Sequence, residues 1–217
     1  MGRRPLHVVW DWNGTLFDDH EAVVAAVGDA LTGLGLPAID AATYRAHYTR
    51  PVQRFYERLT GRAIDPGDWP ALDDAFHDSY AGRLARVGLV PGAVEALDAV
   101  EAAGRTQSLL SMWRHADLVP AVERLGLGGR FTRVDGLRGE GGGFKAGHLA
   151  AHLAALGLDG ADVVLIGDAL DDLAAARAAG APCVLYDGGS HEHAALDATG
   201  APVAATLAEA LAAAGVS

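Results

Sequence analysis

Short apolar runs recur along the chain and alternate with Ala- and Leu-rich stretches of helical length. The runs most typical of strands cover residues 6–10, 106–112, 131–134, 163–167 and 182–186. Strands that alternate with helices form βαβ units, whose strands lie parallel to one another. The pattern therefore predicts an α/β fold with a doubly wound, Rossmann-like parallel sheet.

A long helical segment interrupts this alternation. The first two predicted strands are separated by residues 11–105, far more than an ordinary crossover needs. Gly and Pro breaks divide this interval into predicted helices at about 20–34, 43–48, 51–60 and 71–87. A further helix opens after Val90-Pro91-Gly92. We expect a core formed by residues 1–18 plus 87–217, with residues 19–86 inserted as a helical unit.

Composition and charge exclude several classes of protein. The chain has 217 residues, half of them hydrophobic, which suits one folded domain with an insertion. No apolar run approaches the roughly 18 residues that span a bilayer, and residues 1–5 show no export signal, so we expect a cytoplasmic protein without a membrane partner. A net charge of −11 argues against nucleic-acid binding. The single cysteine, Cys183, is expected to be a buried thiol, and the oligomeric state stays open.

Two groups of carboxylates directly follow predicted strands. Asp11 ends the first strand at a Gly14-Thr15 turn, and Asp168 and Asp172 come just after residues 163–167. Ligands of open parallel sheets bind at the carboxyl ends of the strands, which makes Asp11 a candidate nucleophile. Carboxylate oxygens suit Mg²⁺. Taken alone, an acidic cluster at a helix start is as readily a helix cap.

Two further polar residues lie near the ends of the second and third strands. Ser111 ends the second, and Lys145 follows the third. Lys145 is the sole lysine beside sixteen arginines. A lone Ser or Lys is usually a surface residue, and the scarcity of lysine also fits a biased base composition.

In this order the residues resemble the four motifs of the haloacid dehalogenase superfamily of phosphatases, in its phosphoglycolate phosphatase-like and β-phosphoglucomutase-like branch. The first motif, D-x-D-G-T-[LV], corresponds to Asp11-Trp12-Asn13-Gly14-Thr15-Leu16, with Asn13 in place of the second Asp. The motifs then continue with Ser111, with Lys145, and with Asp168 and Asp172. The resemblance spans nearly the whole chain.

The resemblance implies a role for each of these residues. Asp11 attacks phosphorus and forms a phosphoaspartyl intermediate, with Asn13, Ser111 and Lys145 as the other catalytic positions. The implied phosphate-binding residues are Gly14, Thr15, Ser111, Met112 and Lys145. The implied Mg²⁺ ligands are Asp11, the carbonyl of Asn13, Asp168 and Asp172.

The inserted segment, residues 19–86, resembles the mobile helical cap of the superfamily. Such a cap excludes water and selects a small phosphorylated metabolite. Arg54 and its neighbours Arg50 and Arg58 are candidates for holding a second anionic group of the substrate. The alternative for these arginines is an ordinary solvated helix face.

Asn13 departs from the superfamily at a position that matters for chemistry. The Asp found there protonates the leaving group and then activates water, which an amide cannot do. General acid–base catalysis contributes about 10² to 10⁴ in rate. Three outcomes stay open: a leaving group that needs no proton, a proton supplied by Asp18, Asp19 or His20, or a sensor that binds phosphate or holds phosphoaspartate with little turnover. We predict a Mg²⁺-dependent phosphatase, with the sensor as the alternative.

Overall fold

The computed structural model describes residues 7–139 and 143–216, so the N-terminal stretch searched for an export signal lies outside the described residues. Six parallel strands form one sheet in the order β3-β2-β1-β4-β5-β6. They are β1 His7–Trp10, β2 Thr106–Arg114, β3 Val134–Leu137, β4 Val163–Gly167, β5 Cys183–Tyr186 and β6 Val203–Ala204. This order changes direction between β1 and β4, where open α/β sheets bind their ligands.

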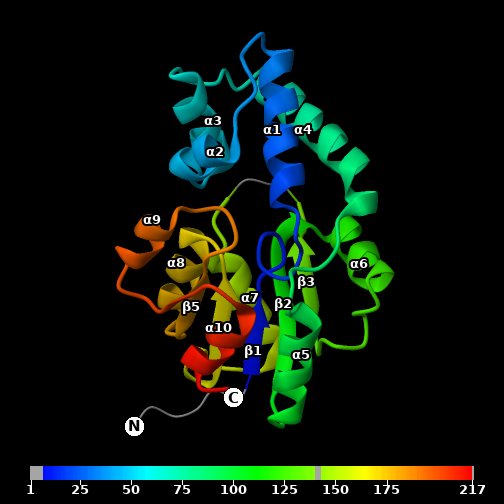
Figure 1. The fold of residues 1–217 in the computed structure, drawn as a ribbon, viewed down its shortest axis with the longest axis vertical. Coiled ribbons are helices and arrows are strands. Elements are labelled where there is room, and N and C mark those ends of the chain that lie inside the picture. The colour runs from blue at the N-terminus through cyan, green and yellow to red at the C-terminus, as the bar shows by residue number, and fades with distance from the viewer. Residues whose placement is uncertain (1–6, 140–142, 217) are drawn as a thin grey trace.

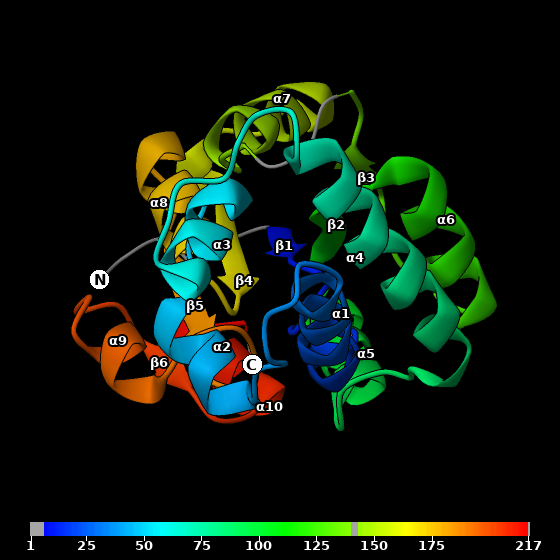
Figure 2. The same ribbon diagram turned by 90° about the horizontal axis from the view of Figure 1, so that it is seen from above.

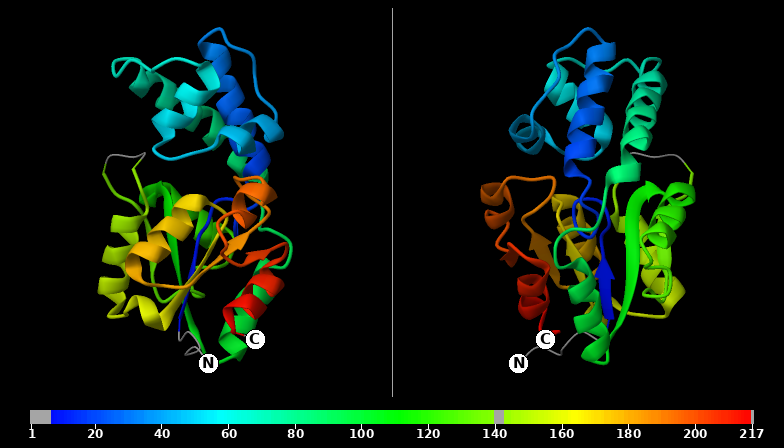
Figure 3. Two further views of the ribbon diagram at one scale, coloured as in Figure 1. Left: turned by 90° about the vertical axis from the view of Figure 1, so that its left-hand side faces the viewer. Right: turned by 45° about the vertical axis from the view of Figure 1, so that its right-hand side comes forward.

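Helices cover both faces of the sheet (Figures 1 and 3). They are α5 Ala93–Ala102, α6 His115–Arg124, α7 Ala146–Leu156, α8 Leu170–Ala179, α9 His193–Asp197 and α10 Leu207–Ala214, with short 3₁₀ turns at Leu84–Arg86 and Gly160–Asp162. Side chains alternate along each strand. Val8 therefore packs with α5, α6 and α10 on one face, whereas Val9 packs with α7, α8 and α9 on the other.

A second group of helices lies beyond the carboxyl ends of the strands (Figure 1). It comprises α1 His20–Gly33, α2 Ala41–His47, α3 Val52–Thr60 and α4 Trp69–Arg83. Seen from above, α2 and α3 lie to one side of β1 and α4 to the other (Figure 2). The four helices share an apolar cluster of their own that includes Val27, Tyr44 and Phe55. The chain enters and leaves this group by adjacent paths, since Asp18 N donates to Gly88 O at 3.1 Å and Val90 N to Leu16 O at 3.0 Å.

The third strand lies further along the chain than its apolar run suggested. We predicted residues 131–134, but β3 is Val134–Leu137 and shares only Val134 with that range. The reason is Gly136, which resembles a strand break in the sequence. Here a Cβ on Gly136 would lie 2.7 Å from the backbone of Trp113 and His115, so the missing side chain lets β3 approach the end of β2. The two-residue β6 was not predicted at all. Cys183 is buried, as expected.

Candidate functional site

Asp11 occupies the carboxyl end of the central strand. Its backbone N–H donates to Ile166 O of β4 at 2.9 Å, and the side chain is buried. The chain then turns tightly at Gly14, whose φ is +72°. Any side chain there would be strained, and its Cβ would lie 2.8 Å from Asp168 Oδ2. The glycine thus allows the loop after Asp11 to lie directly against the acidic loop after β4.

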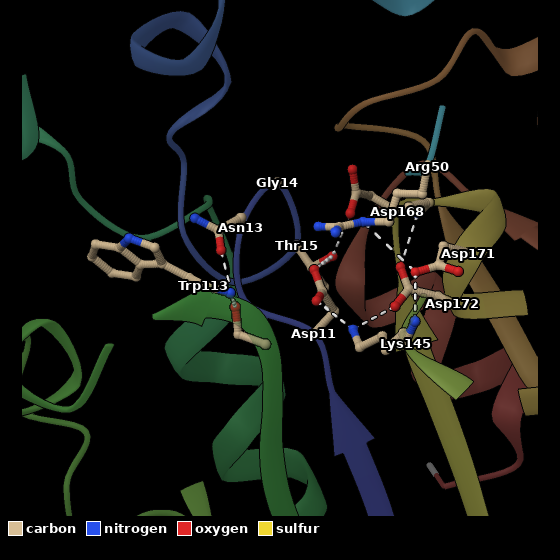
Figure 4. A network of polar contacts seen from close by, with 12 residues as sticks. Asp11, Asn13, Gly14, Thr15, Arg50, Trp113, Lys145, Asp168, Asp171 and Asp172 are labelled. Carbon is tan, nitrogen blue, oxygen red and sulfur yellow. Dashed lines mark hydrogen bonds and ion pairs between the residues drawn. The ribbon is translucent and has the colours of Figure 1, made fainter. Parts of the chain in front are cut away.

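Three carboxylates converge at this edge of the sheet (Figure 4). Asp11, Asp168 and Asp172 each offer an oxygen, and these oxygens lie within 4.8 Å of one another. Ser190 N donates to Asp168 at 2.6 Å, and Ala169 N donates to Asp172 at 3.0 Å. The structure therefore brings together the three predicted side-chain metal ligands.

Burial of these carboxylates disfavours their charged forms. It raises the pKa of Asp11 to about 8, against the opposing effect of Lys145, and it raises the pKa of Asp168 to about 6, with the charge of Asp172 adding to the effect. A bound cation would relieve this repulsion. An all-oxygen set of a few carboxylates fits the donor preference of Mg²⁺.

Lys145 lies between two of these carboxylates. Its Nζ donates to Asp11 Oδ1 at 2.5 Å and also to Asp172 Oδ1, although the residue is only 2% exposed. Burial by itself lowers the pKa of Lys145, but the two carboxylates outweigh burial and raise the pKa above its usual value. The ammonium group therefore stays charged beside the candidate nucleophile.

The predicted phosphate-binding residues lie around the Asp11 carboxylate, and some of their donor groups already have hydrogen-bond acceptors within the protein. The N–H groups of Gly14 and Thr15 already donate within the turn, to Phe17 O and Trp12 O. The Thr15 hydroxyl lies 3.2 Å from Asp11 Oδ2. Ser111 Oγ donates to Asn13 Oδ1 at 3.0 Å, and Met112 borders a cavity that lies between the sheet and the helical segment.

The Asn13 amide is held in one orientation by two residues of the helical segment. Nδ2 donates to Asp19 Oδ2 at 2.8 Å and to Tyr80 OH at 2.9 Å. Tyr80 OH itself donates to Asp19 Oδ2 at 2.6 Å, and Gly14 N donates to Asp19 Oδ1. Burial raises the pKa of Asp19 to about 6. The sequence offered Asp19 only as one of several acids, and no sequence signal pointed to Tyr80.

A cavity of about 690 Å³ extends from these residues into the space among α1, α2, α3 and α4. Arg50 borders the cavity, with its Nε 3.7 Å from Asp171 Oδ2. Arg54 and Arg58 are exposed and do not border it. Of the predicted cap arginines, the structure therefore brings only Arg50 to the site.

Comparison with known proteins establishes the family. A family model described as haloacid dehalogenase-like hydrolase matches residues 6–180, which is most of the chain. The chain belongs to the haloacid dehalogenase-like hydrolases. Its sequence is 31% identical over 191 residues to a phosphoglycolate phosphatase from Caulobacter vibrioides, covering 85% of this chain and 80% of the relative. A phosphoglycolate phosphatase from Mesorhizobium japonicum is 27% identical over 193 residues, covering 86% and 84%.

Solved structures of low sequence identity share the fold. A family protein from Streptococcus pneumoniae superposes with a TM-score of 0.82 at 20% identity, covering 96% of this chain and 98% of the other. CbbY from Rhodobacter sphaeroides, solved in complex with phosphate, gives 0.75 at 20% identity, covering 97% and 99%. The predicted superfamily, α/β fold and phosphatase class are thus confirmed. Within the described part of this family member, no helix is both long and apolar enough to cross a membrane.

Proposed function

We propose that the protein is a Mg²⁺-dependent phosphatase that hydrolyses a small phosphorylated metabolite through a phosphoaspartyl intermediate on Asp11. The observation that carries this proposal is the surroundings of the Asp11 carboxylate, with Lys145 at 2.5 Å and Asp168 and Asp172 close by. A nucleophile, a fixed positive charge and a cation site are the parts that phosphoryl transfer requires.

Each residue of the site has a separate role in the proposed reaction. One oxygen of Asp11 attacks phosphorus, while the Lys145 ammonium neutralises the phosphoryl oxygens. The hydroxyls of Ser111 and Thr15 donate to the remaining oxygens. Asp168, Asp172, the second oxygen of Asp11 and the Asn13 carbonyl would hold the metal. A bound Mg²⁺ supplies the positive charge that draws the phosphate dianion to a carboxylate.

The helical segment, residues 19–86, completes the site as a cap. Tyr80 and Asp19 reach from it to Asn13, and Arg50 reaches from it to Asp171. Closure of this segment over bound substrate would exclude water during transfer of the phosphoryl group, and its reopening would admit the water that hydrolyses the phosphoenzyme. The localisation in the cytoplasm stays a prediction from sequence.

A sensor with little turnover is the second candidate function, and the Asn13 amide favours it. Both hydrogens of Nδ2 are already donated, to Asp19 and to Tyr80, so the amide presents only an acceptor to Ser111. Asn13 can therefore neither protonate a leaving group nor activate water. Among the suggested replacements, Asp18 is exposed and lies away from the cavity, whereas Asp19 and His20 border it.

Sustained, Asp11-dependent turnover separates the two candidates. Native protein with Mg²⁺ is assayed against a panel of metabolites that begins with phosphoglycolate, the compound named for the relatives, and includes acetyl phosphate. The Asp11→Asn variant is measured in parallel, with Asp18→Asn as a surface control. We expect turnover that Asp11→Asn abolishes. A single burst of product without further turnover would support the sensor, and full activity of Asp11→Asn would contradict the phosphoaspartyl route.

A further inference from the structure

The upper part of the cavity is walled by aromatic rings. On the side of α2 and α3 a connected group of rings borders it, with Tyr44 and Tyr48 stacked at 5.2 Å and Phe55 and Tyr56 beside them. On the side of α4, Phe76 stacks on Tyr80 with their ring centroids 5.6 Å apart. Figure 2 shows α2 and α3 facing α4 across the molecule. Flat apolar walls of this kind favour a ligand with an aromatic ring.

Among the described residues that border the cavity, no Lys or Arg is free to bind a second anionic group. Seven carboxylates border it against one lysine and two arginines, and each of these three side chains is already paired. Lys145 contacts Asp11 and Asp172, Arg50 lies 3.7 Å from Asp171, and Arg114 lies 3.4 Å from Asp73. A substrate carboxylate would therefore meet net negative charge unless it displaced one of these pairs.

The two histidines that border the cavity add no positive charge to it at pH 7. Burial lowers the pKa of His20 to about 4, and burial also lowers the pKa of His77.

The volume of the cavity also favours a ligand with a ring. At about 30 Å³ for each water molecule, 690 Å³ holds roughly twenty waters. A two-carbon phosphate ester would leave most of this space as water against aromatic walls. A ring system would displace that water and bury apolar surface.

We infer that the substrate of this site is a phosphate ester of an aromatic group that carries no second negative charge. The inference rests on the proposed phosphatase function. It also fits Asn13, because a phenol has a pKa near 10, as in tyrosine, and leaves with far less need of a proton than an alkyl alcohol does.

Binding of two phosphonates to the native protein tests the inference without requiring turnover. Calorimetry in Mg²⁺ compares benzylphosphonate, which carries a ring, with phosphonoacetate, which carries a carboxylate. We expect benzylphosphonate to bind at least about tenfold more tightly, a difference of about 1.4 kcal/mol. Equal or tighter binding of phosphonoacetate, or no binding of either compound, would overturn the inference.

A pair of matched variants locates the ring. Phe76→Leu removes a half-buried ring from the cavity wall, whereas Phe131→Leu removes a half-buried ring that packs on the core away from the cavity. Phe76→Leu should weaken the binding of benzylphosphonate about threefold to tenfold, because aromatic pairs contribute about 0.5–1.5 kcal/mol. The binding of phosphonoacetate should stay unchanged. Phe131→Leu should change neither. Equal losses for both ligands in Phe76→Leu would contradict a ring-specific wall.

Turnover of three esters distinguishes failure of the inference from failure of the proposed function. Benzyl phosphate and phosphoglycolate are compared by kcat/KM, since neither has a strongly acidic leaving alcohol, and acetyl phosphate reports general activity. A higher value for benzyl phosphate supports the inference. A higher value for phosphoglycolate overturns it while the phosphatase function stands. If no ester is hydrolysed but benzylphosphonate still binds more tightly, the phosphatase function fails and the ligand class stands.

Discussion

Lys145 and Asn13 decide the chemistry of this site at the scale of single residues. The first supplies a buried positive charge, and the second replaces a carboxylic acid by an amide whose donors are already engaged. In the proposed mechanism, Lys145 would strengthen attack on phosphorus, whereas Asn13 would limit departure of the leaving group and release of phosphate.

Removing Lys145 should slow the reaction strongly. In Lys145→Ala the carboxylates of Asp11 and Asp172 lose the ammonium that contacts both of them. We expect kcat to fall by about 10² to 10³, the scale measured when a preorganised donor is removed from an active site. Arg86→Ala, at an exposed position away from the cavity, is the control for loss of a positive charge. A change of less than about threefold in Lys145→Ala would remove Lys145 from the mechanism.

Replacing Asn13 by Asp should restore an acid. The new carboxyl group would lie where Nδ2 now lies, 2.8 Å from Asp19 Oδ2. Two carboxyl groups at this distance share one proton, because they cannot both ionise. Hydrolysis of alkyl phosphates should rise tenfold or more, and the gain should be larger at pH 6 than at pH 8, where the shared proton is lost. Activated esters should gain less in the first step.

Asn13→Ala serves as the control for this change, because it removes the amide without adding an acid. Burst kinetics assign the deficit of the native protein to one step. A burst followed by slow turnover places it in release of phosphate from Asp11. If Asn13→Asp leaves alkyl phosphate hydrolysis unchanged, another residue already supplies the proton.

At the scale of elements, a chain of buried hydrogen bonds ties the sheet to α7. His7 of β1 and His152 of α7 both contact Ser108 Oγ of β2, at 2.7 and 2.8 Å, and His152 Nδ1 lies 2.7 Å from Asp135 Oδ2 of β3. Ser108, His152 and Asp135 have the contacts of a hydrolytic triad. None of the three borders the cavity beside Asp11, and all three are buried, so we assign them a structural role.

These buried hydrogen bonds should make the stability of the fold sensitive to acid. Burial lowers the pKa of His7 to about 4 and also lowers the pKa of His152, compared with about 6.5 in an unfolded chain. Between these values the unfolded chain takes up protons that the folded protein does not. The stabilisation is therefore complete above pH 6.5 and is lost as the pH falls toward 4.

We expect His7 alone to lower the free energy of unfolding by at most about 3 kcal/mol over this range, because each unit of pKa difference corresponds to about 1.4 kcal/mol. Denaturant unfolding at several pH values measures the decrease. His7→Phe should flatten it, whereas His193→Gln, at an exposed side chain, should not. If the free energy of unfolding of His7→Phe decreased with falling pH as steeply as that of the native protein, other groups would cause the loss of stability.

At the scale of the whole molecule, the proposed metal site joins segments far apart in the sequence. Asp11 follows β1, whereas Asp168 and Asp172 follow β4. We expect a chelator to stop turnover and Mg²⁺ to raise Tm, because a cation relieves the repulsion among these buried carboxylates. Ca²⁺ should inhibit, since its longer and looser coordination misplaces the phosphate.

The Asp168→Asn variant supplies the control for this prediction. It removes one of the clustered charges and should raise Tm of the chelated protein while abolishing the increase caused by Mg²⁺. Differential scanning calorimetry with and without chelator measures both effects. Full activity in chelator would point instead to metal-free chemistry.

The arrangement of the core could be predicted because its signals are local. Fully apolar strands separated by Ala-rich helices specify a parallel sheet, and such a sheet brings residues after β1 and β4 to one edge. Asp11, Lys145 and Asp168 could therefore be assigned to one place from their order alone. The position of β3 could not, because the role of Gly136 depends on how closely β2 approaches.

The sequence by itself determined the family pattern, the strand-end carboxylates and the departure at Asn13. Only the tertiary structure decided which partners Asn13 has and which side chains border the cavity. Asn13 and Tyr80 are 67 residues apart in the sequence. They come into contact because α4 packs along α1, and this packing places Tyr80 beside the loop after β1. Arg50 lies in the loop before α3 and borders the cavity, whereas Arg54 lies on the exposed side of α3 and does not, because packing of α3 against its neighbours decides which segments line the cavity. Such contacts depend on the relative placement of whole elements, which no local pattern of residues encodes.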